Sequence, residues 1–249
     1  MKKSIKRVIS LSLCLAMMAM AYIPAFSAEE NTISGLLPHD PARVEEYLSS
    51  LTEEELNIIA EREAITQAYL ASSIRAARAP TTWSHLPGTF TLYGQITEYY
   101  CGPAVVQSTL HYLNKSTPPS QFQIGLDLGT TMFGTDFLKL RPYLNRNQSV
   151  INYIHITDLS KTKMEGNFQV DIVVWNVPPI VTLIGSEDEG WRYDSDGHVV
   201  MINACRDDRT EFQIADTIIG LYGLPDPYYS RPSSVIHTAM VNFGAGYLY

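Results

Sequence analysis

The spacing of apolar residues predicts two helices in the first third of the chain. Asp40 is a favourable N-cap and a proline follows it at the first helical position, so we expect a short helix over residues 40–51. Thr52 and Glu55 then have the spacing of a capping box, which predicts a second, longer helix that ends before Pro80. Acidic residues gather at the start of this helix and arginines at its end, as the helix dipole favours.

A third apolar helix begins at Cys101. Val106, Leu110 and Leu113 recur at helical spacing. Pro103 fits the first turn, where its missing N–H breaks no hydrogen bond. Two further helices are expected, one over residues 121–128 and one over residues 136–144 with Thr135 as its cap.

Short strand patterns fill the second half of the chain. β-Branched and aromatic residues predict strands at 150–156, 180–184, 198–204 and 211–215, and a final hairpin of residues 239–243 and 247–249. Residues 168–177 fit either a helix or a strand. Helices first and an antiparallel sheet second predict an α+β fold.

The first 27 residues have the layout of a secretory signal peptide. Four basic residues precede an apolar run over residues 8–23, and the small residues Ala25 and Ser27 predict cleavage after Ser27. The apolar run is short for a stable membrane span, and an uncleaved anchor is the alternative. We therefore expect a bacterial protein that is secreted, free or associated with the cell surface, without stable membrane insertion after cleavage.

Composition divides the rest of the chain into a helical N-terminal extension, residues 28–80, and a body, residues 81–249. Loss of the signal peptide removes four positive charges and takes the net charge from −8 to −12. Because nucleic-acid binding depends mainly on Lys and Arg, this charge argues against a nucleic-acid partner. The extension is either a propeptide that covers the site until it is cut near Arg75–Arg78, or a packed structural segment or partly ordered tail.

Cys101 carries the strongest chemical signal in the chain. A thiol at a helix N-terminus is favoured as the thiolate, because the helix dipole and the free N–H groups stabilise negative charge there. Gln95 lies six residues earlier and is placed to donate its side-chain amide to an oxyanion beside the sulfur. A reactive thiol with an amide donor is typical of nucleophilic catalysis.

Three segments resemble the papain-like cysteine peptidases that are related to bacteriocin-processing (double-glycine) enzymes. They are YYCGPAVVQSTLHYLN, the later LGTT, and GHVVMINACRDDRTEFQIAD, all within residues 92–221. The likeness is greatest to the free-standing, exported peptidase-like branch of that group. It implies a papain-like fold in which the nucleophile helix packs on an antiparallel sheet.

The resemblance also implies roles for individual residues. Cys101 is the nucleophile, His198 the general base, Asp216 the residue that orients the base, and Gln95 the oxyanion donor. The position of His198 at the start of an apolar strand, with Asp216 at the end of the next strand, is compatible with this arrangement. Threonine follows Asp216 where the family usually has proline, so three other residues stay as alternatives for the orienting role: Asn203, Asp207 and Asp208.

Cys205 is the other cysteine expected after signal cleavage. A disulfide between Cys101 and Cys205 is the alternative in an exported protein, but the apolar strand around Cys205 favours a buried free thiol. The sequence has no C-x-x-C or H-x-x-x-H pair and no phosphate-binding glycine loop. We therefore expect neither a metal nor a cofactor.

Together these features predict an exported cysteine peptidase that hydrolyses peptide bonds, or other amide bonds, through an acyl-enzyme intermediate. The expected partner is a peptide or protein substrate. Two alternatives stay open. One is a transpeptidase, acyltransferase or cell-wall amidase that uses the same residues, and the other is a non-catalytic surface-binding protein with a Cys101–Cys205 disulfide.

Overall fold

A computed structural model describes residues 33–73, 81–219 and 226–249 of the chain. The predicted signal peptide, residues 1–27, and the predicted cut near Arg75–Arg78 lie outside these described residues. Residues 33–249 belong to one compact unit, so the described part of the extension packs with the body.

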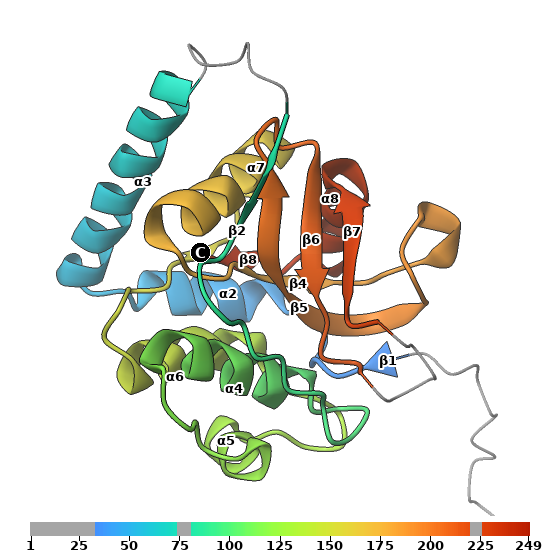
Figure 1. Cartoon of the computed structure of the whole chain (residues 1–249). Helices are drawn as coiled ribbons and strands as arrows, with labels where there is room; N and C mark the ends of the chain where they lie inside the picture. The colour runs from blue at the N-terminus through green and yellow to red at the C-terminus, as the bar shows by residue number, and fades with distance from the viewer. Residues whose placement is uncertain (1–32, 74–80, 220–225) are drawn as a thin grey trace, which may run out of the picture. The chain divides into compact units, whose positions relative to one another are not determined.

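Helices and strands occur in the mixture expected for an α+β fold (Figure 1). The helices are α2 (Pro41–Ser49), α3 (Glu53–Ser73), α4 (Cys101–Asn114), α5 (Gln121–Leu128), α6 (Leu140–Asn147), α7 (Lys161–Val170) and α8 (Ser233–Phe243). The strands are β1 (Ile33–Ser34), β2 (Trp83–His85), β3 (His155–Ile156), β4 (Ile180–Leu183), β5 (Ser195–Arg206), β6 (Glu211–Ala215), β7 (Tyr228–Pro232) and β8 (Tyr247–Leu248). None of the helices within the described ranges is both long and apolar enough to cross a membrane.

Strand β5 organises the sheet. The strands follow the order β3-β8-β4-β5-β6-β7 in antiparallel pairs, and β5 also pairs with β2 (antiparallel) and β1 (parallel). Residues Val199–Ile202 of β5 are fully buried, because helices α4 and α7 both contact this strand. Such burial explains why its sequence is a continuous apolar run without polar alternation. Helix α4 therefore packs on an antiparallel sheet, as expected.

The two N-terminal helices begin at the residues that the sequence predicts. Asp40 caps α2 by accepting a hydrogen bond from the Ala42 N–H at 3.0 Å. Thr52 and Glu55 form both bonds of the capping box before α3, with the Glu55 N–H donating to the Thr52 hydroxyl at 3.2 Å and the Thr52 N–H donating to the Glu55 carboxylate at 2.9 Å. The sequence predicts these hydrogen bonds because each joins residues only two or three positions apart.

The predicted strand over residues 150–156 is wrong for most of its length, since only His155–Ile156 pairs with β8. Side chains satisfy the preceding backbone instead. The side-chain oxygen of Gln148 accepts hydrogen bonds from the N–H groups of Val150 and Ile151, and that of Asn145 accepts one from Tyr153.

The predicted strand over residues 239–243 is also wrong, because this segment is the end of α8. Ile236, Ala239, Met240 and Phe243 are buried and recur at helical spacing, so the helix turns one apolar face to the core. Tyr247–Leu248 do form a strand, β8, but it pairs with β3 and β4.

Thr135 is not the cap that the sequence predicts. Asp136 caps the 3₁₀ turn Phe137–Lys139 by accepting a hydrogen bond from the Leu138 N–H at 3.1 Å, and α6 follows from Leu140. The backbone of Thr135 instead forms hydrogen bonds to Gly35 and Leu37, beside the candidate site described below. Of the ambiguous residues 168–177, residues 168–175 are helical, as the end of α7 and a π-helical turn, Asp171–Trp175.

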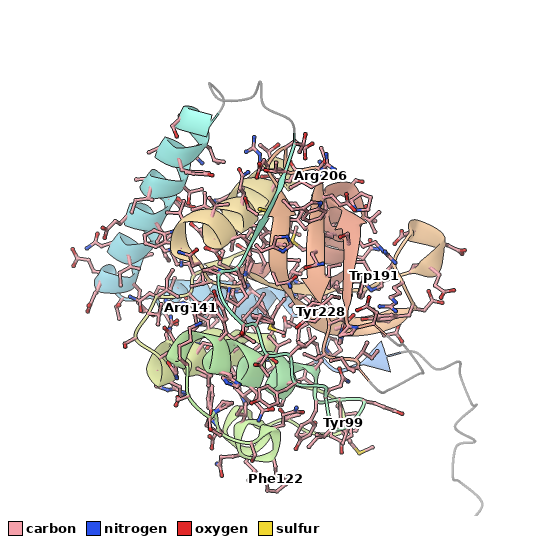
Figure 2. All side chains as sticks on the ribbon, in the orientation of Figure 1. Tyr99, Phe122, Arg141, Trp191, Arg206 and Tyr228 are labelled. Carbon is pink, nitrogen blue, oxygen red and sulfur yellow. The ribbon has the colours of Figure 1, made fainter. Side chains whose placement is uncertain are left out.

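A buried ion pair fastens α3 to the body. The Arg62 guanidinium donates to the Asp171 carboxylate at 2.6 Å and to the Asn152 carbonyl at 3.0 Å, and the side chains of both charged residues are at most 5% exposed. Burial raises the pKa of Asp171 to about 7, even though Arg62 lowers it. A second arginine, Arg141 of α6 (labelled in Figure 2), donates to Glu55 of α3 at 2.9 Å.

Replacement of Arg62 by methionine is expected to lower the free energy of unfolding by about 3–5 kcal/mol, because the Asp171 carboxylate would stay buried without its cation. Since protonation removes that charge, the loss should shrink as the pH falls well below the Asp171 pKa of about 7. Urea unfolding at about pH 9, where the Asp171 carboxylate of the wild-type protein is ionised, and at acid pH measures both effects.

The control is Lys161→Met, which removes an ion pair with Glu165 from a side chain that is 42% exposed. An exposed helical pair of this kind contributes only about 0.3–0.5 kcal/mol. Equal losses in the two variants would contradict the anchoring role of Arg62.

Candidate active site

Cys101 is the first residue of α4 and is fully buried. Its position at the start of a 14-residue helix places the sulfur at the positive end of the helix dipole. Gly102 lets this end of the helix approach the loop at Thr135, since a Cβ at residue 102 would lie 2.8 Å from the Thr135 hydroxyl oxygen. The Cys-Gly-Pro sequence thus combines a thiol at a helix N-terminus, a close contact and a proline that needs no hydrogen bond.

His198 lies on β5 and is fully buried beside this helix end. Its Nε2 atom is 2.8 Å from an oxygen of the Asp216 carboxylate. Its Nδ1 atom is buried and makes no well-formed hydrogen bond to any residue in the described ranges. The Cys101 side chain nevertheless lies close enough to the imidazole to raise the pKa of His198. The thiol and the ring are therefore neighbours without a well-formed hydrogen bond.

The charge around His198 favours the imidazolium. Burial lowers the pKa of His198, but the charge and hydrogen bond of Asp216, together with a contribution from Cys101, raise it to about 10. An imidazolium beside a cysteine stabilises the thiolate, which is the nucleophilic form. His155, by contrast, is buried with its pKa lowered to about 4, mainly by desolvation, and it bonds a backbone carbonyl.

Asp216 follows the end of β6 and is fully buried. Because Met201 pairs with Ala215, the register places Asp216 diagonally across from His198 on the same face of the sheet. Its first oxygen also accepts a hydrogen bond from the Ile218 N–H at 3.1 Å. The three other candidates for the orienting role do not bond to His198. The carboxylate of Asp207 accepts hydrogen bonds from Thr82 and Ser84, and that of Asp208 accepts them from Arg206 and Thr210. The side-chain oxygen of Asn203 is buried without a partner among the described residues.

Two tyrosines that sequence reasoning missed complete the surroundings of Asp216. The hydroxyls of Tyr193 and Tyr229 both donate to its second oxygen, the latter at 2.7 Å. Burial raises the pKa of Asp216, but the charge of His198 and the hydrogen bonds of His198, Tyr193 and Tyr229 outweigh it, so the pKa lies below its usual value. Tyr229 belongs to β7, a strand that the sequence did not reveal, so no local signal pointed to it.

Gln95 is close to the site, but its side-chain amide does not point to the place beside the sulfur where an oxyanion would form. Its side-chain amide donates two hydrogen bonds of 3.0 Å, to the carbonyls of Thr97 and Glu98, and its side-chain oxygen accepts one from Thr217. The structure therefore shows Gln95 holding the loop that leads into Cys101. The amide is not free to bind an oxyanion in this arrangement.

The N-terminal extension covers the thiol. Residues 33–37, here named the strap, pass directly over it, and a Cβ built on Gly35 would lie only 2.3 Å from the Cys101 sulfur. This contact explains the complete burial of Cys101. The site is thus assembled but closed.

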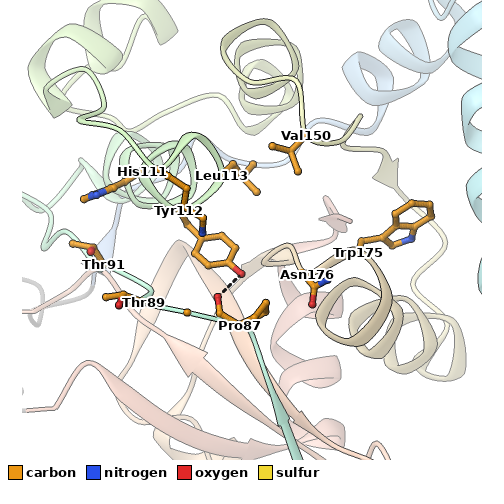
Figure 3. Close-up of a pocket in the computed structure, with 11 residues that line it drawn as sticks. Pro87, Thr89, Thr91, His111, Tyr112, Leu113, Val150, Trp175 and Asn176 are labelled. Atoms are coloured by element: carbon orange, nitrogen blue, oxygen red, sulfur yellow. Dashed lines mark hydrogen bonds between the residues drawn. The ribbon is translucent and has the colours of Figure 1, made fainter.

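A large groove lies elsewhere. It has a volume of about 760 Å³ and is bordered by the loop at Pro87, by His111 and Tyr112 of α4, and by Trp175 (Figure 3). The Tyr112 hydroxyl donates to the Pro87 carbonyl across it at 3.1 Å. None of the predicted site residues lines this groove, so its size does not make it the active site.

The second cysteine does not take part. Cys101 and Cys205 are both free and buried, and no disulfide joins them. Burial, with a smaller contribution from the charge of Asp207, raises the pKa of Cys205 to about 12. Among the described residues, no group of three or more His, Cys, Asp or Glu side chains could hold a metal ion.

Comparison with known proteins gives a match in structure but not in sequence. The fold is similar to that of xylellain, a cysteine protease from Xylella fastidiosa, at a TM-score of 0.52 and 14% identity, covering 84% of this chain and 93% of that one. The fold is that of a papain-like cysteine peptidase. A C39-like peptidase from Bacillus anthracis also matches, with a TM-score of 0.46 and 11% identity over 66% of this chain and 96% of that one. No family model and no curated protein matches the sequence.

The predicted resemblance is therefore confirmed at the level of the fold. The match shows a papain-like α+β architecture, and activity needs its own evidence because sequence identity is low.

Replacement of Tyr229 by phenylalanine is expected to lower the free energy of unfolding by about 1.5–3 kcal/mol, the value of a hydrogen bond to a charged group. The lowered pKa of Asp216 makes its share of stability present above its unfolded-state pKa and lost as the pH falls through its folded-state pKa. The deficit of the variant should therefore be full at neutral pH and should shrink only as the pH falls below the ordinary aspartate pKa of about 3.9, as measured by urea unfolding.

Tyr228→Phe is the matched control, since the Tyr228 hydroxyl belongs to the same strand but donates to the neutral Phe90 carbonyl at 3.2 Å. We expect a loss of about 1 kcal/mol that does not change with pH. A pH-independent loss in Tyr229→Phe would show that its hydroxyl does not stabilise the Asp216 charge.

Proposed function

We propose that the protein is a cysteine peptidase with Cys101 as nucleophile, His198 as acid and base, and Asp216 as the residue that orients the imidazole. The observation that carries the proposal is the buried His198–Asp216 hydrogen bond of 2.8 Å beside a thiol at a helix N-terminus. A structural histidine would not require a carboxylate that three further groups hold in its charged form. The papain-like fold supports the same interpretation.

In the proposed reaction, His198 takes the Cys101 proton and the thiolate attacks the carbonyl carbon of a peptide bond, forming a carbon–sulfur bond. The imidazolium then gives its proton to the departing amine as the carbon–nitrogen bond breaks. Water, deprotonated by His198, attacks the resulting thioester and releases the acid and the thiol. Asp216 keeps the ring oriented and favours the imidazolium at each protonated stage.

The oxyanion that forms during attack needs hydrogen-bond donors. The backbone N–H of Cys101 is one proposed donor, because the first N–H groups of a helix have no partner within the helix. The Gln95 amide is the second, and it must first give up one of its two carbonyl partners, Thr97 or Glu98. Its role is thus proposed for the open form of the site.

The predicted location and substrate belong to the same proposal. A basic and then apolar N-terminus supports export from a bacterial cell, and the acidic net charge supports a peptide or protein substrate over a nucleic acid. We propose an enzyme that acts outside the cytoplasm, free or at the cell surface.

A mixture of tryptic peptides from a whole proteome is a suitable substrate pool, because it presents many peptide bonds at once. We expect new peptide ends by mass spectrometry with the chain of residues 28–249 or its more open Gly35→Ala form, and none with Cys101→Ala in either background. Cys205→Ala is the control and should retain activity, because that thiol is buried on β5 with its pKa raised to about 12. Products that appear equally with Cys101→Ala would contradict the proposal. An absence of new peptide ends with both the chain of residues 28–249 and its Gly35→Ala form would also contradict it.

The pH dependence tests the role of Asp216. Because its negative charge raises the pKa of His198, activity should fall in alkaline solution as the imidazolium loses its proton near pH 10. Asp216→Asn removes that charge, so the alkaline limb should move to lower pH by about one unit or more. We also expect kcat/KM to fall at least about tenfold. An unchanged alkaline limb would exclude Asp216 from the site.

A further inference from the structure

The carboxylate of Asp216 uses its whole capacity as an acceptor. Its first oxygen lies 2.8 Å from His198 Nε2 and also accepts from the Ile218 N–H at 3.1 Å. Its second oxygen accepts from the hydroxyls of Tyr193 and Tyr229. Because an ionised carboxylate offers about four acceptor positions, these partners fill it and stop it from turning. The oxygen that faces the imidazole is therefore fixed from the far side of the carboxylate.

The two tyrosines reach this second oxygen from different segments. Tyr193 lies two residues before β5, and its ring meets the imidazole of His198 edge-on with 6.0 Å between the ring centroids. Tyr229 lies on β7 opposite Ile214 of β6, and its ring packs edge-on against Trp191 (labelled in Figure 2) at 6.1 Å. Packing thus holds each ring in place, so each hydroxyl donates from a fixed position.

Two arginines lie against the ring of Tyr229. The guanidinium carbons of Arg192 and Arg231 are each 4.9 Å from the centroid of that ring. Neither arginine forms an ion pair with a carboxylate in the described part of the chain, so no carboxylate there cancels its charge. A cation beside a phenol ring stabilises negative charge on the phenol oxygen, which makes the O–H group a stronger donor. The surroundings of Tyr229 therefore strengthen its hydrogen bond to Asp216.

The tyrosine hydroxyls keep their protons where His198 titrates. Burial and the charge of Asp216 raise the pKa of Tyr193 and that of Tyr229 well above the ordinary value. Burial lowers the pKa of His198, but Asp216 and Cys101 raise it to about 10. His198 is therefore the member of this group that changes its charge. Among the described residues, the titratable and charged side chains around the pair and its tyrosines are Cys101 of α4, Arg192 and Tyr193 before β5, Asp216 after β6, and Tyr229 and Arg231 of β7.

The hydroxyls divide the charge of Asp216. A carboxylate that is hydrogen-bonded on its second oxygen attracts a cation at its first oxygen less strongly, because the donors take part of the negative charge. In the proposed reaction His198 must give its proton to the departing amine, and an acid whose pKa lies far above the working pH does this poorly. Donors on the second oxygen therefore limit how tightly the pair holds that proton.

We propose that Tyr193 and Tyr229 are positioning residues of the enzyme: their hydroxyls fix the second oxygen of Asp216 and take part of its charge, so that the first oxygen orients His198 without trapping its proton. The proposal rests on the proposed peptidase function for its effect on catalysis. Its physical part, the effect of the hydroxyls on the proton affinity of His198, can be measured without any substrate.

The test is a ¹⁵N NMR titration of His198 in the chain of residues 28–249 and in its Tyr229→Phe variant. Tyr229 is the residue to change, because its ring packs on Trp191, whereas the ring of Tyr193 packs on the imidazole itself. Loss of the hydroxyl leaves more of the Asp216 charge facing His198, so the His198 pKa should rise by about half a unit or more. This shift is opposite in direction to the one expected of Asp216→Asn.

Tyr228→Phe is the matched control, since it removes a hydroxyl of the same strand that donates to the Phe90 carbonyl at 3.2 Å. It should leave the titration of His198 unchanged. A Tyr229 hydroxyl that only stabilised the fold would affect the free energy of unfolding and would not move that titration. An unchanged or lowered His198 pKa in Tyr229→Phe would therefore overturn the proposal, as would an equal rise in Tyr228→Phe.

Replacement of Tyr229 by 3-fluorotyrosine provides the second arm and decides alone if Tyr229→Phe does not fold. Fluorine withdraws electrons from the ring and makes the hydroxyl a stronger donor, while the shape of the side chain changes little. The His198 pKa should then fall below the wild-type value, because the hydroxyl takes a larger part of the Asp216 charge. No change, or a rise, would contradict the sharing of charge.

Activity measurements separate this proposal from the proposed function. With a tryptic peptide that the enzyme cleaves, kcat of Tyr229→Phe should fall about tenfold with little change in KM, because the hydroxyl acts on the acid and base and not on substrate binding. A raised His198 pKa in Tyr229→Phe without peptide cleavage by any form would uphold the effect of the hydroxyl on the pair and remove the peptidase function. Cleavage by Tyr229→Phe with the wild-type kcat would keep the peptidase and overturn the positioning role.

Discussion

The buried carboxylate of Asp216 is the constraint on which the site depends. An ionised carboxylate without water is costly unless its oxygens are fully hydrogen-bonded. Here the imidazole of His198, two tyrosine hydroxyls and a backbone N–H surround it. These donors come from β5 and the residues just before it, from the residues after β6, and from β7, so the three strands must be paired before the charge can be tolerated. The same charge then favours a protonated His198 beside the thiol.

Close approach of backbone segments is the second constraint, and glycine makes it possible. Gly102 allows the Thr135 loop to contact the start of α4, and Gly134 and Gly35 allow the strap to lie between that loop and the sulfur. Gly197 has φ +154° and places its carbonyl toward the strap immediately before His198. The residue that binds the strap is therefore next in sequence to the proposed base. Any group that enters the site must replace the strap on the same backbone hydrogen-bond partners.

The features that the sequence predicts correctly are those with a local cause. Asp40, Thr52 and Glu55 mark helix starts through bonds between residues two or three positions apart. Cys101 and His198 also stand out because of their neighbours in the sequence, but their catalytic roles, like that of Asp216, come from the resemblance and stay predictions.

The features that the sequence does not predict depend on distant contacts. Tyr229 acquires its role only when β7 pairs with β6, and Tyr193 acquires its role only when β5 pairs with β6. Gly35 meets Cys101 across more than sixty intervening residues. The apolar run at 239–243 fits both a strand and a helix, and packing of its buried face on β4 decides for the helix. The position of the Gln95 amide is likewise set by the Thr97–Glu98 loop rather than by its spacing from Cys101.

The protonation state of His198 tests the account most directly. In ¹⁵N NMR of the folded protein at about pH 8, above the ordinary histidine pKa, both ring nitrogens of His198 should carry a proton, because its pKa is raised to about 10. Asp216→Asn should lower that pKa. A neutral His198 ring in the wild-type protein at this pH would contradict the charged Asp216–His198 pair and, with it, the proposed origin of the reactive thiolate.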